Sequence, residues 1–236
     1  MKRKNINEIK KLESSPQIIK LFSEKEIKNI LGLYNSLPVT VHNKKQNVIK
    51  KRWLQNINKS LDKIFISKLK EILGEFKMDN LQSDDGHDFY GLFQESFAPL
   101  KLHVDSGFDL KTTIYKQTLV PLSEGETVIF ENRWYGQSTN FTIDKSELNT
   151  DKSIKIRGHN KRSSEHLDVF GKAEFNISDY NKYLRHENIG NLKGLKILMV
   201  YKWKIGEILI FDRSHLHCSS CNIKNRKLGL TTFTKK

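Results

Sequence analysis

The spacing of apolar residues changes near residue 87, and this change constrains the fold more than any other feature. Before it, Ser23 and Glu26 form a capping box ahead of one helical apolar stripe, and residues 60–73 carry a second. After it come short apolar or alternating runs bounded by Gly, Pro, Asn and Ser, which predict strands over 97–104, 114–122, 127–130, 195–203, 208–211 and 228–234. Such a series of short strands is typical of a β-sandwich or β-barrel.

The order of these patterns predicts the domain organisation. Residues 1–86 are expected to form a helical N-terminal region that packs on a β domain formed by residues 87–236. Residues 131–194 are polar and poor in strand pattern, with one helix expected near residues 178–184. We interpret this segment as an insertion that partly covers one mouth of the β domain, where substrate lids occur.

Charge and composition restrict the class of protein. The 236 residues carry a formal net charge of +14, of which 18 Lys+Arg against 8 Asp+Glu in residues 1–80 contribute +10. Lys outnumbers Arg. This excess indicates a compositional bias of the whole chain rather than an Arg-rich surface that recognises phosphates and bases. No apolar run approaches the roughly 20 residues that span a bilayer. Two cysteines and the lack of an apolar stretch after the basic N-terminus favour a cytoplasmic protein.

One short run carries residues suited to a metal ion. Leu100, Leu102 and Val104 alternate with polar residues, so on a strand His103 and Asp105 point to the same face. An imidazole and a carboxylate so placed can share one metal ion, and a third ligand from a distant strand would complete a facial triad. A second His-x-Asp match, His166-Leu-Asp168, follows no alternating strand, and we interpret it as a chance match.

The C-terminal segment supplies the missing third residue. Gly206 marks a turn, the apolar run 208–211 follows, and Phe211-Asp-Arg-Ser-His-Leu-His217 leads to a last strand that begins near Arg226 and Lys227. Three features thus follow one another along the chain: a His-x-Asp pair, a distal histidine after a late strand, and a basic residue about ten positions further on. This order resembles that of the iron(II)- and 2-oxoglutarate-dependent dioxygenases. The resemblance covers residues 87–236 and implies a double-stranded β-helix, also called a jelly roll or cupin-like fold, with a helical N-terminal region.

The resemblance also implies a site and an activity. His103, Asp105 and His217 would bind iron(II), and Arg226 or Lys227 would pair with the distal carboxylate of the cosubstrate 2-oxoglutarate. Three protein ligands on one face leave room for the keto acid and for dioxygen. The implied reaction is hydroxylation of a substrate, a small molecule or a peptide, with release of succinate and carbon dioxide.

The choice between the two basic residues depends on strand register. A guanidinium can bind a carboxylate through two parallel hydrogen bonds, which favours Arg226, but a slip of one residue would exchange it with Lys227. Tyr115 and Thr118 are further candidates for a hydroxyl near the same carboxylate.

Neighbouring residues have alternative interpretations. His215 would share a strand face with His217 and is expected to line the pocket. Asp212 and Arg213 are expected to form an ion pair at the surface or in a turn, and Trp203 to lie in the core. A structural zinc held by His215, His217, Cys218 and Cys221 is an alternative, although four ligands within seven residues are closer together than in usual zinc sites.

Two other functions compete with the oxygenase hypothesis. A non-enzymatic module could bind nucleic acid or another acidic ligand through the basic residues 1–80. A cupin-like metalloprotein could use the same metal ligands without 2-oxoglutarate.

Overall fold

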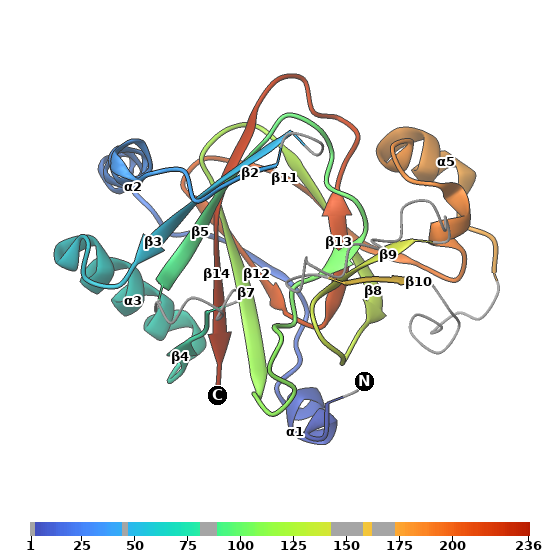
Figure 1. The fold of residues 1–236 in the computed structure, drawn as a ribbon, viewed down its shortest axis with the longest axis horizontal. Helices are drawn as coiled ribbons and strands as arrows, with labels where there is room; N and C mark the ends of the chain where they lie inside the picture. The colour runs from blue at the N-terminus through green and yellow to red at the C-terminus, as the bar shows by residue number, and fades with distance from the viewer. Residues whose placement is uncertain (1–2, 44–46, 81–88, 143–157, 162–172) are drawn as a thin grey trace.

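Two β-sheets face each other across the middle of the protein (Figure 1). The computed structural model describes residues 3–43, 47–80, 89–142, 158–161 and 173–236. In the larger sheet the strand order is β1-β12-β7-β14-β5-β3-β2, with β4 beside β14. Its strands are β1 (Gln17–Lys20), β2 (Val41–Asn43), β3 (Val48–Leu54), β4 (Lys77–Met78), β5 (Phe89–Ser96), β7 (Ile114–Pro121), β12 (Glu207–Asp212) and β14 (Lys227–Lys235).

The smaller sheet has the order β10-β9-β6-β13-β8-β11. Its strands are β6 (His103–Val104), β8 (Glu126–Arg133), β9 (Thr139–Thr142), β10 (Gly158–Lys161), β11 (Ile197–Lys202) and β13 (His215–Ser219). Along the chain, β5, β6, β7 and β8 alternate between the two sheets, and β11, β12, β13 and β14 do so again. Each of these eight strands pairs in antiparallel register with one or two strands of the other quartet. This winding is the double-stranded β-helix predicted from the sequence.

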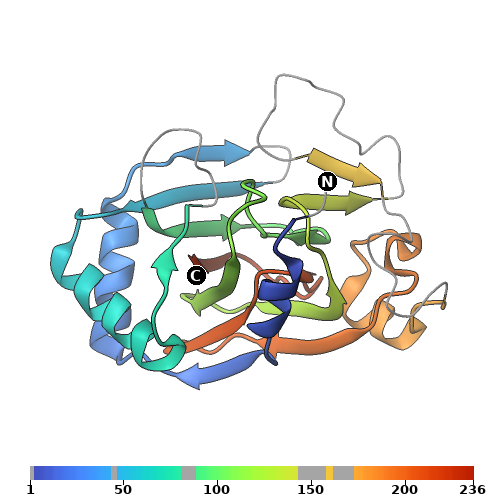
Figure 2. The same ribbon diagram turned by 90° about the horizontal axis from the view of Figure 1, so that it is seen from below.

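Apolar side chains form three layers, one between the sheets and one on the outer face of each. The interior layer joins both sheets through Leu119, Ile129, Tyr201, Trp203, Leu209 and Phe211. Outside the larger sheet, α2 (Glu24–Ser36) and α3 (Lys59–Leu73) cover a second cluster. Outside the smaller sheet, the segment with α5 (Ile177–Asp179), η3 (Tyr180–Leu184) and η4 (Ile189–Leu192) covers the third. Figures 1 and 2 show these helices on opposite sides of the molecule.

The N-terminal region contains the two predicted helices and also strands that the sequence pattern did not indicate. Ser23 and Glu26 form the expected capping box of α2, and α3 ends at Gly74, whose φ of +67° suits glycine. Preceding α2 are α1 (Ile6–Lys11) and β1, which pairs with β12. β3 pairs with β5, so the N-terminal region extends the larger sheet as well as covering it.

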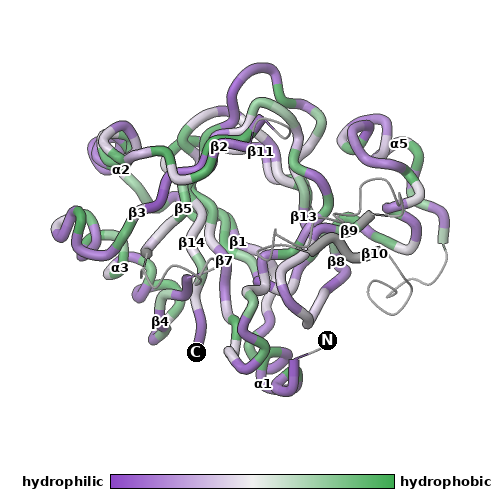
Figure 3. The backbone as a smooth tube through the Cα atoms, viewed as in Figure 1, coloured by the Kyte–Doolittle hydropathy of each residue, from purple (hydrophilic) through white to green (hydrophobic). Residues whose placement is uncertain are grey.

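Phe65 anchors α3 to the larger sheet, and its replacement gives a stability prediction. Its fully buried ring stacks on Phe22 at 5.7 Å and meets Trp53 edge-on at 5.2 Å. Figure 3 shows hydrophilic residues on the outward turns of α2 and α3. Phe65→Ala is expected to lower the free energy of unfolding by about 3–5 kcal/mol, because it leaves a cavity in this cluster. Urea denaturation would measure this loss of stability. The control is Ile64→Ala, because the adjacent Ile64 is 37% exposed, and its effect on the free energy of unfolding is expected to be well under half as large.

Most of the predicted strands are present, with one clear error. Strands occupy the predicted runs in 114–122, 127–130, 195–203, 208–211 and 228–234. The strand predicted over 97–104 is wrong. Only His103 and Val104 form a strand there, and the longer strand β5 ends before this run begins. The helix predicted near 178–184 is confirmed by α5 and η3. Within the described chain, no helix is long and apolar enough to cross a membrane.

The described part of the predicted insertion both extends the smaller sheet and packs on its outer face. β9 pairs with β6, and Leu184 and Leu192 join the apolar cluster there. The rest of the insertion, residues 143–157 and 162–172, lies outside the described residues. A cover over the mouth of the β domain therefore stays a prediction.

Candidate metal centre

Neighbouring strands of the smaller sheet bring the two predicted histidines together. β13 and β6 are antiparallel, and their register pairs His217 with His103. Residues directly opposite each other on adjacent strands point to the same face, and here that face is the interior. The two imidazole centroids are 4.2 Å apart, and the ring of Phe211 in the interior layer contacts His217 at 5.1 Å. All three candidate ligands are buried, with 5–7% exposed.

The ligand atoms converge on one point. Asp105 Oδ2 lies 3.7 Å from His103 Nε2 and 3.5 Å from His217 Nε2. The Nδ1 atom of His103 faces the carbonyl oxygen of Lys101 at 2.6 Å, and that of His217 faces the carbonyl oxygen of His215 at 3.1 Å. A carbonyl only accepts, so each Nδ1 carries a hydrogen, and in the neutral imidazole the lone pair is then on Nε2. Both Nε2 atoms and a carboxylate oxygen thus face one another.

This arrangement fits a divalent transition-metal ion. The three residues form the one group, among the described His, Cys, Asp and Glu, whose ligand atoms all lie within 4.8 Å of one another. Metal–ligand bonds of about 2.1 Å at right angles would separate the ligand atoms by about 3 Å, close to the spacing seen here. Backbone carbonyls fix both histidine tautomers, as in metal sites whose outer partners orient the ligands. Two His and one Asp on one face match a facial triad.

Buried charged residues that sequence reasoning missed hold the ligand segment in place. Arg213 donates from Nε to the carbonyl oxygen of Asp105 at 3.1 Å and from Nη1 to Asp79 at 2.6 Å. From the other side, the buried Glu187 carboxylate accepts from the backbone N–H of Leu102 at 2.5 Å. These partners lie between 85 and 134 positions apart in sequence, so no local pattern could have revealed them.

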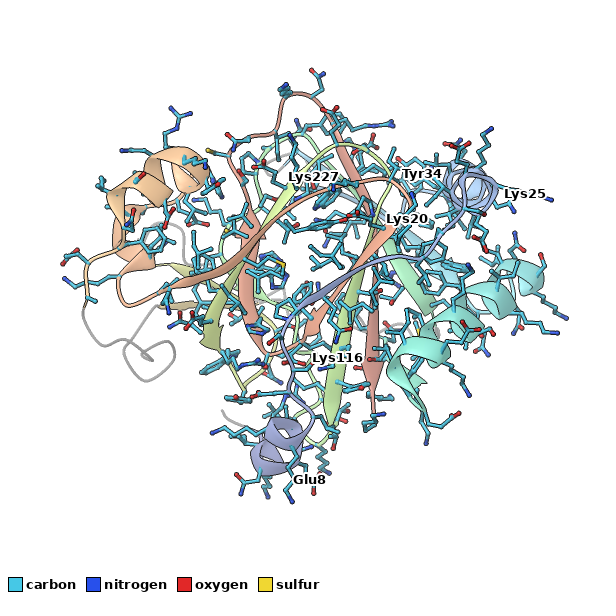
Figure 4. All side chains as sticks on the ribbon, turned by 180° about the vertical axis from the view of Figure 1, so that it is seen from behind. Glu8, Lys20, Lys25, Tyr34, Lys116 and Lys227 are labelled. Carbon is cyan, nitrogen blue, oxygen red and sulfur yellow. The ribbon has the colours of Figure 1, made fainter. Side chains whose placement is uncertain are left out.

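Of the two predicted cations, Lys227 faces the interior and Arg226 faces outward. Lys227 is 6% exposed, and its Nζ lies 2.6 Å from Ser219 Oγ and 4.6 Å from the Trp203 ring centroid. Figure 4 shows Lys227 near the middle of the molecule, whereas Lys25 projects from α2. Arg226 is half exposed and pairs with Glu95 at 3.1 Å on the side of the larger sheet that carries α2.

Burial changes the acid–base behaviour of Lys227. Desolvation lowers the pKa of its ammonium group to about 8, and the fields of Cys218 and Glu126 oppose this shift only in part. Gly229 makes room for the arrangement, because a Cβ there would lie 2.9 Å from the ring of Trp203. The interior thus holds a cation that is close to losing its proton at neutral to mildly alkaline pH.

Tyr115 and Thr118, the predicted hydroxyl donors, do not face the centre. Tyr115 donates to the carbonyl oxygen of Leu73 at the end of α3, and Thr118 bonds to Thr232 at 2.6 Å. Gln117, one of the two residues between them, does face the centre, since its Nε2 lies 3.2 Å from Asp105 Oδ2.

The expected ion pair between Asp212 and Arg213 is wrong. Both residues are buried at the corner between β12 and β13 and bind other partners. Asp212 pairs with Lys116 and Arg133 and accepts from the N–H of Ser14, because the N-terminal segment covers this corner. A carboxylate and a guanidinium enclosed in this way each require a buried partner, which sequence proximity does not supply.

His215 and the cysteines do not join the metal ligands. His215 is buried, with its Nδ1 2.7 Å from the carbonyl oxygen of Phe130. Cys218 packs in the apolar cluster outside the smaller sheet, on the face of β13 opposite to His217, where burial keeps its pKa well above the usual value. The alternative zinc site therefore has no common point for its four ligands. Trp203 lies in the core as expected, and His166 and Asp168 lie outside the described residues.

Comparisons based on sequence give no relatives. No protein-family model matches the chain, and no curated protein matches it.

Comparison of structures does give matches. The epimerase SnoN from nogalamycin biosynthesis, described as non-heme and α-ketoglutarate dependent, matches with a TM-score of 0.53 and 9% identity over 98% of this chain and 84% of SnoN. HygX from Streptomyces hygroscopicus, solved with nickel, 2-oxoglutarate and hygromycin B, matches with a TM-score of 0.50 and 11% identity over 98% of this chain and 86% of HygX. The chain thus has the double-stranded β-helix fold of known 2-oxoglutarate-dependent enzymes, which confirms the fold implied by the sequence resemblance.

Proposed function

We propose that the protein is an iron(II)- and 2-oxoglutarate-dependent dioxygenase that hydroxylates a small molecule or peptide and releases succinate and carbon dioxide. The observation that carries the proposal is the convergence of His103 Nε2, His217 Nε2 and Asp105 Oδ2 in the interior of this fold. SnoN was also solved with Fe3+ and α-ketoglutarate, and HygX with nickel and 2-oxoglutarate. These structures support the same pair of cofactors here.

His103, Asp105 and His217 would hold iron(II) through one face and leave the opposite face open. When bound, iron(II) and 2-oxoglutarate supply the oxidising chemistry with dioxygen, which protein side chains alone lack. The contribution of the chain is to fix the ligands. Lys101 and His215 carbonyls orient the imidazoles, and Arg213 holds the backbone of Asp105.

Lys227 would bind the distal carboxylate of 2-oxoglutarate, with Ser219 as a neighbouring hydroxyl donor. A buried ammonium group beside the ring of Trp203 attracts an anion more strongly than an exposed one, because little water screens the pair. Ser219 follows His217 by two positions on β13, and Lys227 opens β14 in the facing sheet. The buried cation and the metal ligands therefore open onto the same interior.

Anaerobic titration of the metal-free protein tests the proposal. Iron(II) is added first and 2-oxoglutarate second, while the visible spectrum is recorded. The expected result is a weak charge-transfer band that appears with 2-oxoglutarate and not with succinate, which lacks the keto group that chelates the metal. Metal binding without this band would replace the proposal with the cupin-like alternative, in which 2-oxoglutarate has no role. Failure to bind metal would contradict both.

A further inference from the structure

The Asp105 carboxylate has a partner that the proposed function does not use. Gln117 lies on β7, opposite Phe211 of β12 and Phe233 of β14. It is 4% exposed, and its Nε2 donates to Asp105 Oδ2 at 3.2 Å. This oxygen is the one that faces His103 and His217. The amide thus contacts the oxygen expected to bind the metal.

The orientation of the Gln117 amide follows from chemistry. A carboxylate only accepts hydrogen bonds, so the NH2 group must face Asp105 and Oε1 must point away. Oε1 is buried and has no hydrogen-bond partner among the described residues. Among the described residues, the contact with Asp105 is the one hydrogen bond of this side chain. A buried acceptor without a donor lowers stability, and an apolar side chain between two phenylalanines would avoid that cost.

We propose that Gln117 is a positioning residue that fixes the rotation of the Asp105 carboxylate for metal binding. One hydrogen bond to Oδ2 occupies one lone pair and holds the carboxylate in the plane that presents the remaining lone pair to the histidines. A side chain at position 117 that donates no hydrogen bond would remove this restraint from Oδ2. The inference rests on the metal centre of the proposed function, but it does not depend on 2-oxoglutarate or on the substrate.

Metal affinity tests the role directly. The metal-free protein is titrated with Co²⁺ alone, whose visible absorption reports binding, and Gln117→Met is compared with wild type. Methionine has nearly the same length and shape but donates no hydrogen bond. The expected result is a dissociation constant about 10- to 100-fold higher, the range typical of losing a hydrogen-bond partner of a metal ligand. The matched control is Gln94→Met on the neighbouring part of the same sheet, which is expected to leave Co²⁺ affinity unchanged.

A second readout separates positioning from a general loss of structure. The thermal midpoint of metal-free Gln117→Met is expected to stay within a few degrees of wild type, because removal of the unpartnered Oε1 offsets loss of the bond to Asp105. Should this variant fail to fold, Gln117→Asn, whose amide is one methylene too short to reach Asp105, is expected to give the same loss of affinity. Co²⁺ affinity equal to wild type in a folded variant would overturn the proposal, as would an equal loss in Gln94→Met.

The result is distinguishable from a failure of the proposed function. Wild-type protein that binds Co²⁺ but shows no charge-transfer band with iron(II) and 2-oxoglutarate would end the oxygenase proposal and leave the role of Gln117 testable. Wild-type protein that does not bind Co²⁺ would overturn the role of Gln117 together with the metal centre.

Discussion

His217→Ala is expected to abolish both metal binding and succinate production. His217 supplies one of three converging ligand atoms, and its Nε2 lies 3.5 Å from Asp105 Oδ2. A site left with one imidazole and one carboxylate loses the third point that fixes the metal. The loss of affinity is therefore expected to exceed the roughly 10- to 100-fold typical of an outer-shell partner. Calorimetric titration with iron(II) under argon, and succinate release in the presence of 2-oxoglutarate, would measure the two effects.

Two histidine variants serve as controls for His217→Ala. His42 is exposed on β2, so His42→Ala is expected to bind metal as wild type does. His166→Ala tests the second His-x-Asp match of the sequence and is also expected to leave metal binding intact. Loss of binding in His166→Ala together with its retention in His217→Ala would contradict the assignment of the metal centre.

Five strands between residues 114 and 234 were predictable because they depend on local periodicity. His103, Asp105 and His217 were instead singled out by the order of a His-x-Asp pair and a late histidine, which resembles a known enzyme family. The alternation that placed His103 and Asp105 on one face lies in a run of which only two residues form a strand. The sequence pattern cannot give the register that places these two histidines opposite each other. Register is set by pairing between segments more than a hundred residues apart, and only the folded chain contains that information.

Buried charges were the least predictable part of the site. Asp212 and Arg213 are adjacent, and adjacency favoured a local ion pair. Asp212 instead pairs with Lys116, and Arg213 with Asp79, since the two side chains point to different sides of the corner that they form. The strands β1 and β3 were missed for a related reason. Neither sequence shows a clean apolar alternation, and pairing with β12 and β5 determines their conformation.

Lys227→Met is expected to weaken binding of 2-oxoglutarate while leaving metal affinity intact. The substitution keeps much of the side-chain volume beside Trp203 but removes the buried positive charge that lies 2.6 Å from Ser219 Oγ. Loss of a hydrogen bond to a charged group corresponds to about 1.5–3 kcal/mol, which is roughly a 10- to 150-fold increase in the dissociation constant. Titration of the charge-transfer band with 2-oxoglutarate would measure it. Arg226→Met is the matched control, because Arg226 pairs with Glu95 on the outer side of the sheet.

The pH dependence of the same titration gives a signature specific to Lys227. Burial lowers the pKa of its ammonium group to about 8 in the free protein, so the group is charged below that pH and neutral above it. Affinity for the dicarboxylate is therefore expected to be constant at pH 6.5–7 and to fall by up to about tenfold per pH unit above pH 8, because binding then requires uptake of a proton. Lys227→Arg, whose guanidinium stays protonated, is expected to retain measurable affinity with a flat profile over this range. A wild-type profile that is also flat up to pH 9.5 would show that another group binds the carboxylate.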